Sequence, residues 1–456
     1  MAPKFGTSGL RGLVTELTPD LVAAHIHAFA AACPMGSGIW VGRDLRPSSP
    51  ALAEVVLSAA QAAGLATVDC GAVPTPALAL AAMQAGAAAV MVTGSHIPAD
   101  RNGLKFYTPL GEITKAHEAA ILAALPRPAP ADPAIHGPAR RQAAGVGAAW
   151  RARILAAFGP QALAGMRIGV WDHSAVSRDL LAETLAGLGA EPVPLGRSET
   201  FVPVDTEAVS DQARAALAGW APGLAAILST DGDGDRPLLA DGTGAVIPGD
   251  ILGQITAAAL GAEIVVTPVS SNSGAEASGA FGRVIRTKIG SPFVIAAMEA
   301  AGGKVAGYEA NGGFLLGFAA QGPAGMLAPL MTRDSLLPLV AVLAEARKAG
   351  GLSALISRQP ARFTATDRLE NTPPEATGPL LARLTADPAP LLAGLAETEA
   401  ARDLTDGLRL TLASGRVLHL RPSGNAPEFR LYAEAETPAA ARALLEAARA
   451  AVAARL

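Results

Sequence analysis

Short apolar runs alternate with longer amphipathic segments over the first three quarters of the chain. The apolar runs have the length of buried strands, and the segments between them have the length of helices. At the N-terminal end this pattern predicts strands at 38–42, 66–70 and 87–92 and a helix at 49–64. Such alternation is typical of βαβ units in a mostly parallel sheet.

The same alternation occurs twice more. It predicts strands at 166–171 and 224–228 with helices at 176–187 and 207–220, then strands at 263–268, 283–287 and 304–307 with helices near Ala275 and at 292–301. Three successive α/β units of similar size indicate a structural repeat, although the units share little residue-level identity. Because alanine is abundant and fits either face of a helix, the pattern defines the order of these elements better than their ends.

The last quarter has a different pattern. Runs at 408–413 and 417–420, joined across Ser414-Gly415, predict a β-hairpin, followed by a strand at 429–433 and a closing helix at 438–455. A proline-rich segment at 126–133 tolerates neither a helix nor a central strand. We therefore predict three α/β domains with mixed, mostly parallel sheets and a C-terminal α+β domain with an antiparallel sheet, at 1–140, 141–249, 250–360 and 361–456.

Composition excludes several classes of function. A net charge of −4 provides no general attraction to nucleic acid or to anionic membranes, and 4% aromatic residues leave few platforms for stacking on bases. The longest apolar candidate for a membrane span, 77–92, is too short. We expect no secretion signal, a cytoplasmic location, and two reduced thiols at Cys33 and Cys70.

Three carboxylates, Asp231, Asp233 and Asp235, follow the predicted strand at 224–228. Their period-two spacing aims all three the same way in an extended segment. At about 6 Å apart each pair would repel by roughly 3 kcal/mol at an effective dielectric near 20, so a cation is expected there. Oxygen ligands at this density favour Mg²⁺ over a softer metal. The alternative is a solvated Asp-Gly turn, which is the interpretation we give to Asp241-Gly242.

A polar loop at 93–105 follows the predicted strand at 87–92. Ser95 can accept a phosphoryl group, and His96 and Lys105 can manage protons or charge beside it. A Ser-His dipeptide alone is more often a turn than a catalytic pair, so it gains weight only from the other loops. The loop has no G-x-S-x-G elbow, which argues against an α/β-hydrolase.

Other polar loops contain groups suited to phosphate or sugar. The loop at 421–430 provides two guanidinium groups and a Ser-Gly-Asn turn that could form an anion nest. The loop at 307–313 presents Glu309 and Asn311, a carboxylate and an amide suited to pairs of sugar hydroxyls. Two early loops, at 5–12 and 42–46, contain arginines that could face a phosphate.

Together these loops resemble those of the α-D-phosphohexomutases, the superfamily of phosphomannomutase, phosphoglucomutase and phosphoglucosamine mutase. The resemblance covers nearly the whole chain in the family's order: F-G-T-S-G-L-R-G at 5–12, the serine loop, D-G-D-G-D-R at 231–236, an E-x-N loop at 309–311 and R-P-S-G at 421–424. It implies four domains around one cleft.

The resemblance also implies roles for individual residues. Ser95 would be a phosphoserine, and Mg²⁺ would be held by one of its oxygens with Asp231, Asp233 and Asp235. Arg11, His96 and Lys105 would assist catalysis at Ser95. The substrate would be bound by Glu309 and Asn311 at its hydroxyls, by Arg236, and at its non-reacting phosphate by Arg421, Ser423, Gly424, Asn425 and Arg430. A hexose 1,6-bisphosphate would be both intermediate and activator, turning round in the cleft between two phosphoryl transfers.

Five positions depart from the family pattern. Gly94 and Ile97 stand where the common serine loop, T-A-S-H-N-P, has alanine and asparagine. Asn425 replaces a threonine, and Ala310 replaces a serine in the sugar loop. Ser291 occupies the position of a histidine in many mannose- and glucose-type members, so the proton-handling role of that histidine is left open between His96 and Lys105.

The expected substrates are hexose phosphates, with mannose 6-phosphate and mannose 1-phosphate preferred. Phosphoglucomutase activity is the close alternative because mannose and glucose differ only at C2, and the glucosamine type usually carries E-x-S-G-H instead of E-A-N-G-G. From other classes, a Mg²⁺-dependent sugar-phosphate phosphohydrolase or a non-catalytic sugar-phosphate sensor would use similar loops. We expect a monomer or a homodimer.

Overall fold

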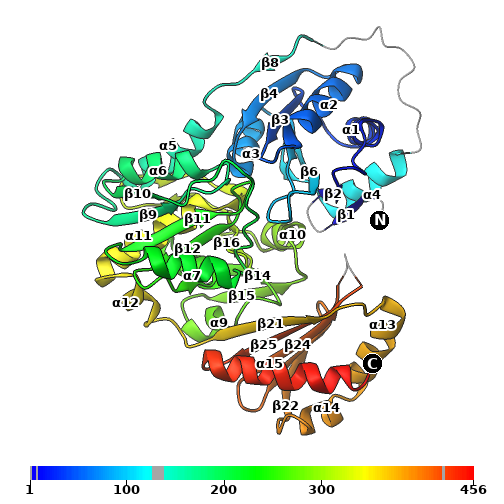
Figure 1. The fold of residues 1–456 in the computed structure, drawn as a ribbon, viewed down its shortest axis with the longest axis vertical. Coiled ribbons are helices and arrows are strands. Elements are labelled where there is room, and N and C mark those ends of the chain that lie inside the picture. Colours follow the sequence, from blue (N-terminus) through cyan, green and yellow to red (C-terminus); the bar gives the residue numbers. More distant parts are fainter. Residues whose placement is uncertain (1–2, 7–8, 126–137, 424–426) are drawn as a thin grey trace.

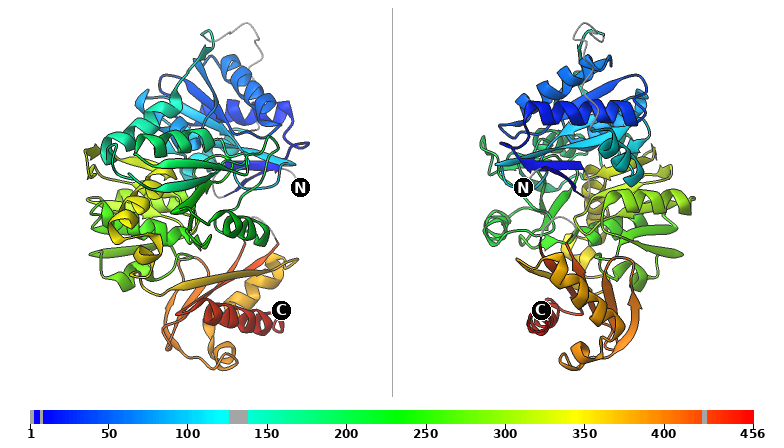
Figure 2. Two further views of the ribbon diagram at one scale, coloured as in Figure 1. Left: turned by 60° about the vertical axis from the view of Figure 1, so that its left-hand side comes forward. Right: turned by 90° about the vertical axis from the view of Figure 1, so that its right-hand side faces the viewer.

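The computed structural model describes residues 3–6, 9–125, 138–423 and 427–456. Four large β-sheets follow one another along the chain (Figure 1). The first sheet, in blue, lies at one end of the long axis, and the last, in orange and red, lies at the other. Figure 2 shows the same order in two turned views. No helix in the described part of the chain has both the length and the apolar character needed to cross a bilayer.

The first sheet is covered by helices on both faces. Its spatial order is β1 (Lys4–Gly6), β2 (Gly9–Leu13), β6 (Arg101–Thr108), β5 (Ala88–Val92), β3 (Ile39–Arg43), β4 (Thr67–Ala72) and β8 (Arg141–Gln142), with β7 (Gly111–Glu112) paired to β6. One face packs on α1 (Pro19–Ala32), α2 (Ser49–Ala62) and α4 (Lys115–Ala124), and the other on α3 (Thr75–Gln84). The central strand β5 is therefore buried at every residue, which explains its continuous apolar run.

The second and third sheets have five strands each. The second runs β10 (Glu191–Leu195), β9 (Arg167–Trp171), β11 (Ala226–Thr230), β12 (Pro237–Asp241) and β13 (Val246–Ile247), with helices α5 (Val146–Phe158), α6 (Arg178–Gly187) and α7 (Asp211–Trp220). The third runs β15 (Arg283–Thr287), β14 (Ile264–Pro268), β16 (Val305–Tyr308), β17 (Phe314–Leu316) and β20 (Leu330–Asp334). Its other elements are α8 (Gly249–Ala259), α9 (Gly274–Ser278), α10 (Ser291–Ala301), α11 (Leu336–Ala349), α12 (Leu352–Ile356) and the hairpin β18 (Ala320–Gln321) to β19 (Met326–Leu327).

The structural repeat predicted from the sequence is confirmed by topology. The strands β4-β3-β5-β6, β10-β9-β11-β12 and β15-β14-β16-β17 have one arrangement, in which three parallel strands are followed by one antiparallel strand. The hydrophobic pattern did not predict the antiparallel members. In β6 the reason is that Asn102 and Lys105 are buried although they are polar, because they face other polar groups inside the protein.

The C-terminal domain is an antiparallel sheet, as predicted. Its order is β21 (Phe363–Leu369), β25 (Phe429–Ala435), β24 (Val417–Pro422), β23 (Leu408–Leu412) and β22 (Glu399–Asp403), with helices α13 (Pro374–Ala386), α14 (Ala389–Ala393) and α15 (Pro438–Ala453). The predicted hairpin joins β23 to β24, and Gly415 takes a left-handed φ of 82° in its turn.

Core packing separates the C-terminal domain from the rest. The largest apolar cluster runs without interruption from the first sheet through the third, whereas the C-terminal domain has a cluster of its own. Polar contacts link the two parts: the Ser273 amide donates to the Glu434 carboxylate at 3.0 Å, and the Ile289 amide donates to the Asp406 carboxylate at 3.1 Å. The four sheets are consistent with four domains, and the exact domain limits stay predictions.

The helix predicted at 207–220 was wrong at its start. The α7 helix begins at Asp211, where the Ser210 hydroxyl caps it by accepting from the Ala213 amide. Just before it, the Asp205 side chain accepts the amides of Glu207 and Ala208 and closes a turn. Residues 205–209 therefore form a non-helical connection instead of a first helical turn.

Candidate active site

Three loops at the same place in the structural repeat form the centre of the candidate site. They connect the third strand to the antiparallel fourth strand: 93–100 between β5 and β6, 231–236 between β11 and β12, and 309–313 between β16 and β17. In open α/β sheets ligands bind at the carboxyl ends of parallel strands. The first loop carries the predicted phosphoryl carrier, the second carries the predicted cation ligands, and the third carries the predicted sugar ligands.

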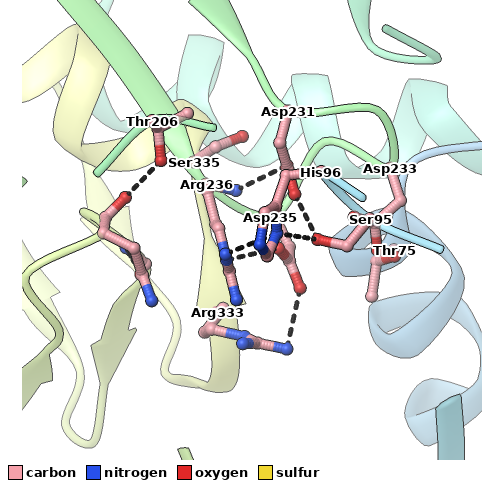
Figure 3. A network of polar contacts seen from close by, with 12 residues as sticks. Thr75, Ser95, His96, Thr206, Asp231, Asp233, Asp235, Arg236, Arg333 and Ser335 are labelled. Atoms are coloured by element: carbon pink, nitrogen blue, oxygen red, sulfur yellow. Dashed lines mark hydrogen bonds and ion pairs between the residues drawn. The ribbon is translucent and has the colours of Figure 1, made fainter. Parts of the chain in front are cut away.

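Ser95 lies directly against the second sheet's loop. Its side chain is buried, and its Oγ donates to Asp231 Oδ2 at 2.5 Å (Figure 3). The residue has a left-handed φ of 56°, an unfavourable backbone conformation for serine that surrounding contacts must maintain. One such contact is the Ser95 amide, which donates to Thr93 Oγ1 at 2.7 Å. The loop thus presents the hydroxyl to the carboxylates in a fixed position.

The serine loop is held by Arg46, one of the arginines that we expected could face a phosphate. That expectation was wrong: the Arg46 guanidinium is buried and donates to the carbonyl oxygens of Ser95, Ile97, Pro98 and Arg101 at 2.6–2.9 Å. Arg46 Nε donates to the buried carboxylate of Asp44. The guanidinium replaces the backbone donors that this irregular loop lacks, so the loop keeps its shape without regular secondary structure.

Arg46 also explains why residue 94 is glycine in this chain. A Cβ on Gly94 would lie 2.6 Å from Arg46 Cζ, and the guanidinium cannot move because four carbonyls hold it. We expect Gly94→Ala to destabilise the folded protein by about 1–3 kcal/mol, the usual cost of inserting a methyl group into a packed site. Thermal and urea unfolding would measure the change.

Gly219 provides the matched control for this substitution. It lies inside α7, and a Cβ there would meet no atom within 4 Å. Gly219→Ala should leave stability unchanged or raise it by about 0.5–1 kcal/mol, because alanine is the better helix former. Equal stability of the two variants would show that Arg46 does not confine residue 94.

The three aspartates converge as their spacing predicted. Asp231, Asp233 and Asp235 are fully buried, and each has an oxygen within 4.8 Å of the others. Lys105 Nζ donates to Asp233 Oδ2 at 2.5 Å and to Asp235 Oδ2 at 2.6 Å. Burial and the two neighbouring carboxylates raise the pKa of Asp231, whereas Lys105 outweighs burial and lowers the pKa of Asp233.

The donor set fits a hard divalent cation. All three groups supply only oxygen, and Lys105 leaves the second oxygens, Asp233 Oδ1 and Asp235 Oδ1, without any hydrogen-bond partner among the described residues. Buried carboxylate oxygens without donors are costly unless an ion or another donor meets them. Mg²⁺ suits such oxygens, and the Ser95 hydroxyl lies beside them.

His96 is engaged on both sides of its ring. Arg236 Nη1 lies 2.8 Å from His96 Nδ1, and because a guanidinium can only donate, Nδ1 accepts this hydrogen bond. His96 Nε2 lies 3.8 Å from the Asp205 carboxylate. Burial and the adjacent Arg236 charge lower the pKa of His96 to about 3, so the ring is neutral at physiological pH.

Three guanidinium groups surround the carboxylates, and sequence reasoning identified two of them. Arg11 and Arg236 line the cavity beside the aspartates. The third is Arg333 at the end of β20, whose Nη2 lies 2.9 Å from Asp235 Oδ2 and whose Nη1 lies 3.7 Å from Glu309 Oε2. In the sequence, the only indication that Arg333 belongs to the site was a polar Thr-Arg-Asp triplet after an apolar run, with no motif around it.

The sugar loop and the serine loop line the same cavity. Glu309 and Asn311 both line the cavity, and the Glu309 side chain has one oxygen, Oε2, without a hydrogen-bond partner among the described residues. The Gly312 amide donates to the Glu309 carbonyl, which closes a tight turn at the left-handed Gly312. Burial raises the pKa of Glu309, against the lowering effect of Arg333.

One cavity of about 970 Å³ connects these groups with the C-terminal domain. Arg430, in β25, lines it, and so does Arg368, its cross-strand neighbour in β21, which no motif had indicated. Arg421 lies beside Arg430 on the other side, with its Nε 3.5 Å from Asp406 Oδ1. Ser423 directly follows Pro422, the last residue of β24. Gly424 and Asn425 lie outside the described residues.

Ser291 does not take over the site of a catalytic histidine. Its hydroxyl donates to Glu112 Oε2 at 2.6 Å, and Thr332 donates to the other oxygen of the same carboxylate at 2.9 Å. These contacts tie α10 and β20 of the third sheet to β7 of the first. Ser291 therefore has a structural partner, and its loop contributes Ile289 and Gly290 to the cavity wall.

Comparison with known proteins agrees with this geometry. Sequence models of the phosphoglucomutase/phosphomannomutase family match residues 2–130 (alpha/beta/alpha domain I), 241–363 (alpha/beta/alpha domain III) and 380–451 (C-terminal domain). A phosphomannomutase of Sinorhizobium fredii is 46% identical, with 98% of each chain covered. A phosphomannomutase of Salmonella muenchen is 41% identical, covering 95% of this chain and 92% of that protein.

A solved structure has the same fold. The crystal structure of a phosphoglucomutase/phosphomannomutase family protein from Burkholderia thailandensis has a TM-score of 0.78 and 21% identity, covering 98% of this chain and 96% of that one. The order of the four sheets, the buried aspartates beside Ser95 and the near full-length relatives lead to one assignment. This chain belongs to the phosphoglucomutase/phosphomannomutase family, within the α-D-phosphohexomutase superfamily of isomerases.

Proposed function

We propose that this protein is a Mg²⁺-dependent phosphomannomutase that interconverts mannose 6-phosphate and mannose 1-phosphate through a phosphoserine at Ser95. The observation that carries the proposal is the hydrogen bond from Ser95 Oγ to Asp231 at 2.5 Å, at the edge of three buried carboxylates. A hydroxyl in that position can carry a phosphoryl group. A cation bound by the carboxylates would then neutralise part of the charge of that group. The substrate preference rests on the two relatives named phosphomannomutase.

The proposed reaction consists of two phosphoryl transfers in opposite directions. In the first, the free hydroxyl of the sugar phosphate attacks the phosphorus of phosphoserine 95, the bond between phosphorus and Ser95 Oγ breaks, and the hydroxyl proton is relayed to the departing Ser95 Oγ. The product is a hexose 1,6-bisphosphate. It turns round in the cavity, Ser95 Oγ attacks its other phosphate, and the proton that leaves Ser95 Oγ is relayed to the released sugar oxygen. Atoms and charge balance over the cycle.

The surrounding side chains would position and neutralise the transferred group. Asp231, Asp233, Asp235 and a phosphoserine oxygen would hold Mg²⁺, which would supply electrostatic stabilisation of the phosphoryl oxygens. Arg11, Arg236 and Arg333 bring three positive charges to the cavity wall beside them. Phosphoryl transfer depends mainly on such positioning and charge stabilisation.

Proton transfer is better assigned to Lys105 than to His96. The His96 nitrogen nearer to Ser95, Nδ1 at 3.4 Å from Oγ, already accepts from Arg236, and its low pKa leaves it without a proton to give. Lys105 holds exchangeable protons beside the carboxylates that face Ser95. We therefore propose that Lys105 exchanges the proton and that His96 orients Arg236.

The C-terminal domain would bind the phosphate that does not react. Arg421 and Arg430 lie side by side on neighbouring strands, and guanidinium groups bind phosphate through paired hydrogen bonds. Ser423, Gly424 and Asn425 would complete this subsite. The cavity of about 970 Å³ is large enough to enclose a hexose bisphosphate while it turns.

A direct assay tests the proposed function. The purified protein with Mg²⁺ and mannose 1-phosphate should form mannose 6-phosphate, and traces of hexose 1,6-bisphosphate should accelerate the reaction. Phosphorus NMR would follow both phosphates and free inorganic phosphate in one sample. Parallel assays with glucose 1-phosphate and glucosamine 1-phosphate would rank the three sugars.

The outcomes separate the alternatives. Stoichiometric release of inorganic phosphate without stimulation by the bisphosphate would indicate a phosphohydrolase and overturn the mutase. Binding without turnover of any of the three sugars would indicate a sensor. Faster turnover of glucose 1-phosphate than of mannose 1-phosphate would reassign the substrate within the same chemistry.

We further propose that the protein acts in the cytoplasm, as a monomer or a homodimer. Cys33 and Cys70 are both buried and unpaired, in accord with a compartment that keeps thiols reduced. Burial also raises the pKa of both thiols, to about 11 and about 12, so neither is a reactive thiolate.

A further inference from the structure

The connection at 205–208 links the serine loop to the sugar loop. Thr206 Oγ1 donates to the Asn311 carbonyl at 2.9 Å (Figure 3). Asp205 Oδ2 lies 3.8 Å from His96 Nε2, beside Ser95. The other oxygen of Asp205 accepts the Glu207 amide at 3.0 Å and the Ala208 amide at 3.2 Å. The backbone of this connection is therefore bonded to the loop that carries the sugar ligands and lies beside the loop that carries the phosphoryl carrier.

Glu207 points from this connection into the cavity. Its side chain is exposed and lines the same cavity as Glu309 and Asn311. No described residue donates a hydrogen bond to its carboxylate or forms an ion pair with it, although its backbone is fixed. A carboxylate without a donor, facing a ligand cavity, is suited to accept hydrogen bonds from the ligand.

Glu207 also lies opposite the C-terminal domain. Tyr432 and Arg430 of β25 line the same cavity as Glu207. The arginines beside the aspartates and in β25 are the groups that attract phosphate. A carboxylate in a cavity lined by these arginines repels phosphate and attracts neutral hydroxyls, so it is suited to the sugar ring.

We propose that Glu207 is a substrate-binding residue that accepts a hydrogen bond from a ring hydroxyl of the hexose phosphate. This inference rests on the proposed function and adds a second carboxylate to the sugar site of Glu309 and Asn311. Glu207 lies in a connection of the second domain, between β10 and α7, and Glu309 lies in a loop of the third, between β16 and β17. The bisphosphate must be held in two orientations. Acceptors on separate walls of the cavity provide hydrogen-bond partners for the hydroxyls of the sugar ring in each orientation.

The test compares Glu207→Ala and Glu207→Gln with a control, Glu199→Gln, in the same connection between β10 and α7. The Glu199 side chain is 84% exposed and lies among surface arginines. With mannose 1-phosphate we expect Glu207→Ala to lower kcat/KM by about 10- to 100-fold, the effect of losing one hydrogen bond to a charged group, and Glu207→Gln to lower it less. Glu199→Gln should behave like the wild type.

Deoxy sugars distinguish direct contact from a structural effect. The 2-, 3- and 4-deoxy analogues of mannose 1-phosphate each remove one hydroxyl. We expect the penalty of Glu207→Ala to disappear with one analogue and to persist with the other two. An equal penalty with all three, or wild-type kinetics of Glu207→Ala, would overturn the inference.

A binding experiment makes this test independent of turnover. Calorimetric titration of mannose 1-phosphate into Ser95→Ala and into the double variant Ser95→Ala/Glu207→Ala should show weaker binding to the double variant, by about 10-fold or more. Equal affinities would overturn the role of Glu207. If the wild type fails to isomerise any hexose phosphate, the proposed function fails, and the binding comparison still decides whether Glu207 binds the sugar.

Discussion

Ser95→Ala is expected to reduce turnover by at least about 10³-fold while sugar-phosphate binding is retained. The substitution removes the atom that would carry the phosphoryl group. It leaves the loop in place, because the contacts that hold residue 95 are made by its backbone: its amide donates to Thr93 Oγ1, and its carbonyl accepts from Arg46. Steady-state kinetics and calorimetric binding of mannose 1-phosphate would measure the two effects separately.

Intact-protein mass spectrometry extends this test. The wild type should gain the mass of one phosphoryl group after incubation with hexose 1,6-bisphosphate, and Ser95→Ala should not. Ser198→Ala is the matched control, because the hydroxyl of this serine hydrogen-bonds to Thr200 within an exposed turn. Retained activity of Ser95→Ala would remove Ser95 from its assigned role, and retained phosphorylation would place the modification on another residue.

Asp231→Asn should strongly reduce turnover without destabilising the metal-free protein. Its carboxylate is buried beside Asp233 and Asp235, and their repulsion and burial raise its pKa. A raised pKa means that the group favours the folded state when protonated and opposes it when ionised at neutral pH. The neutral amide should therefore leave the melting temperature of the metal-free protein unchanged or higher, while turnover falls by about 10³-fold through loss of metal-assisted charge stabilisation.

Metal titration measures the second half of this prediction. Mg²⁺ should raise the melting temperature of the wild type in a concentration-dependent way, and Asp231→Asn should lose most of this response. The control is Asp241→Asn, a neighbouring aspartate that caps the exposed turn between β12 and β13 by accepting from Thr243 and Ala245. That variant should keep the Mg²⁺ response. An Asp231→Asn protein that responds to Mg²⁺ like the wild type would move the cation site elsewhere.

The positions of the three central loops were predictable because each follows a buried strand. Asp231, Asp233 and Asp235 interrupt an apolar run with a spacing that no buried strand would tolerate, and Ser95 and Glu309 do the same in the other two repeats. Strand ends of parallel sheets gather at one edge, so polar groups at those ends were expected to meet. Local pattern and topology were enough for this part of the site.

Arg46, Arg333 and Glu207 could not be assigned in the same way. The loop containing Arg46 resembled a phosphate-binding turn, and only the packed structure shows its guanidinium turned to the carbonyls of the serine loop. Arg333 reaches Asp235 from a strand about 100 residues later in the chain. Glu207 fell within a predicted helix, which Asp205 and Ser210 displace by side-chain hydrogen bonds.

The sequence by itself determined the fold units and the functional groups that they carry. These are three α/β units and an antiparallel C-terminal domain, with carboxylates, a serine and arginines at strand ends. Hydrophobic periodicity and motif spacing act over a few residues, so they carry this information locally. Tertiary structure decided which charges face each other, which arginine holds a loop and which faces the cavity, and where Glu207 points. These depend on contacts between segments distant in the chain, and burial there sets both the pKa values and the cost of every unpaired group.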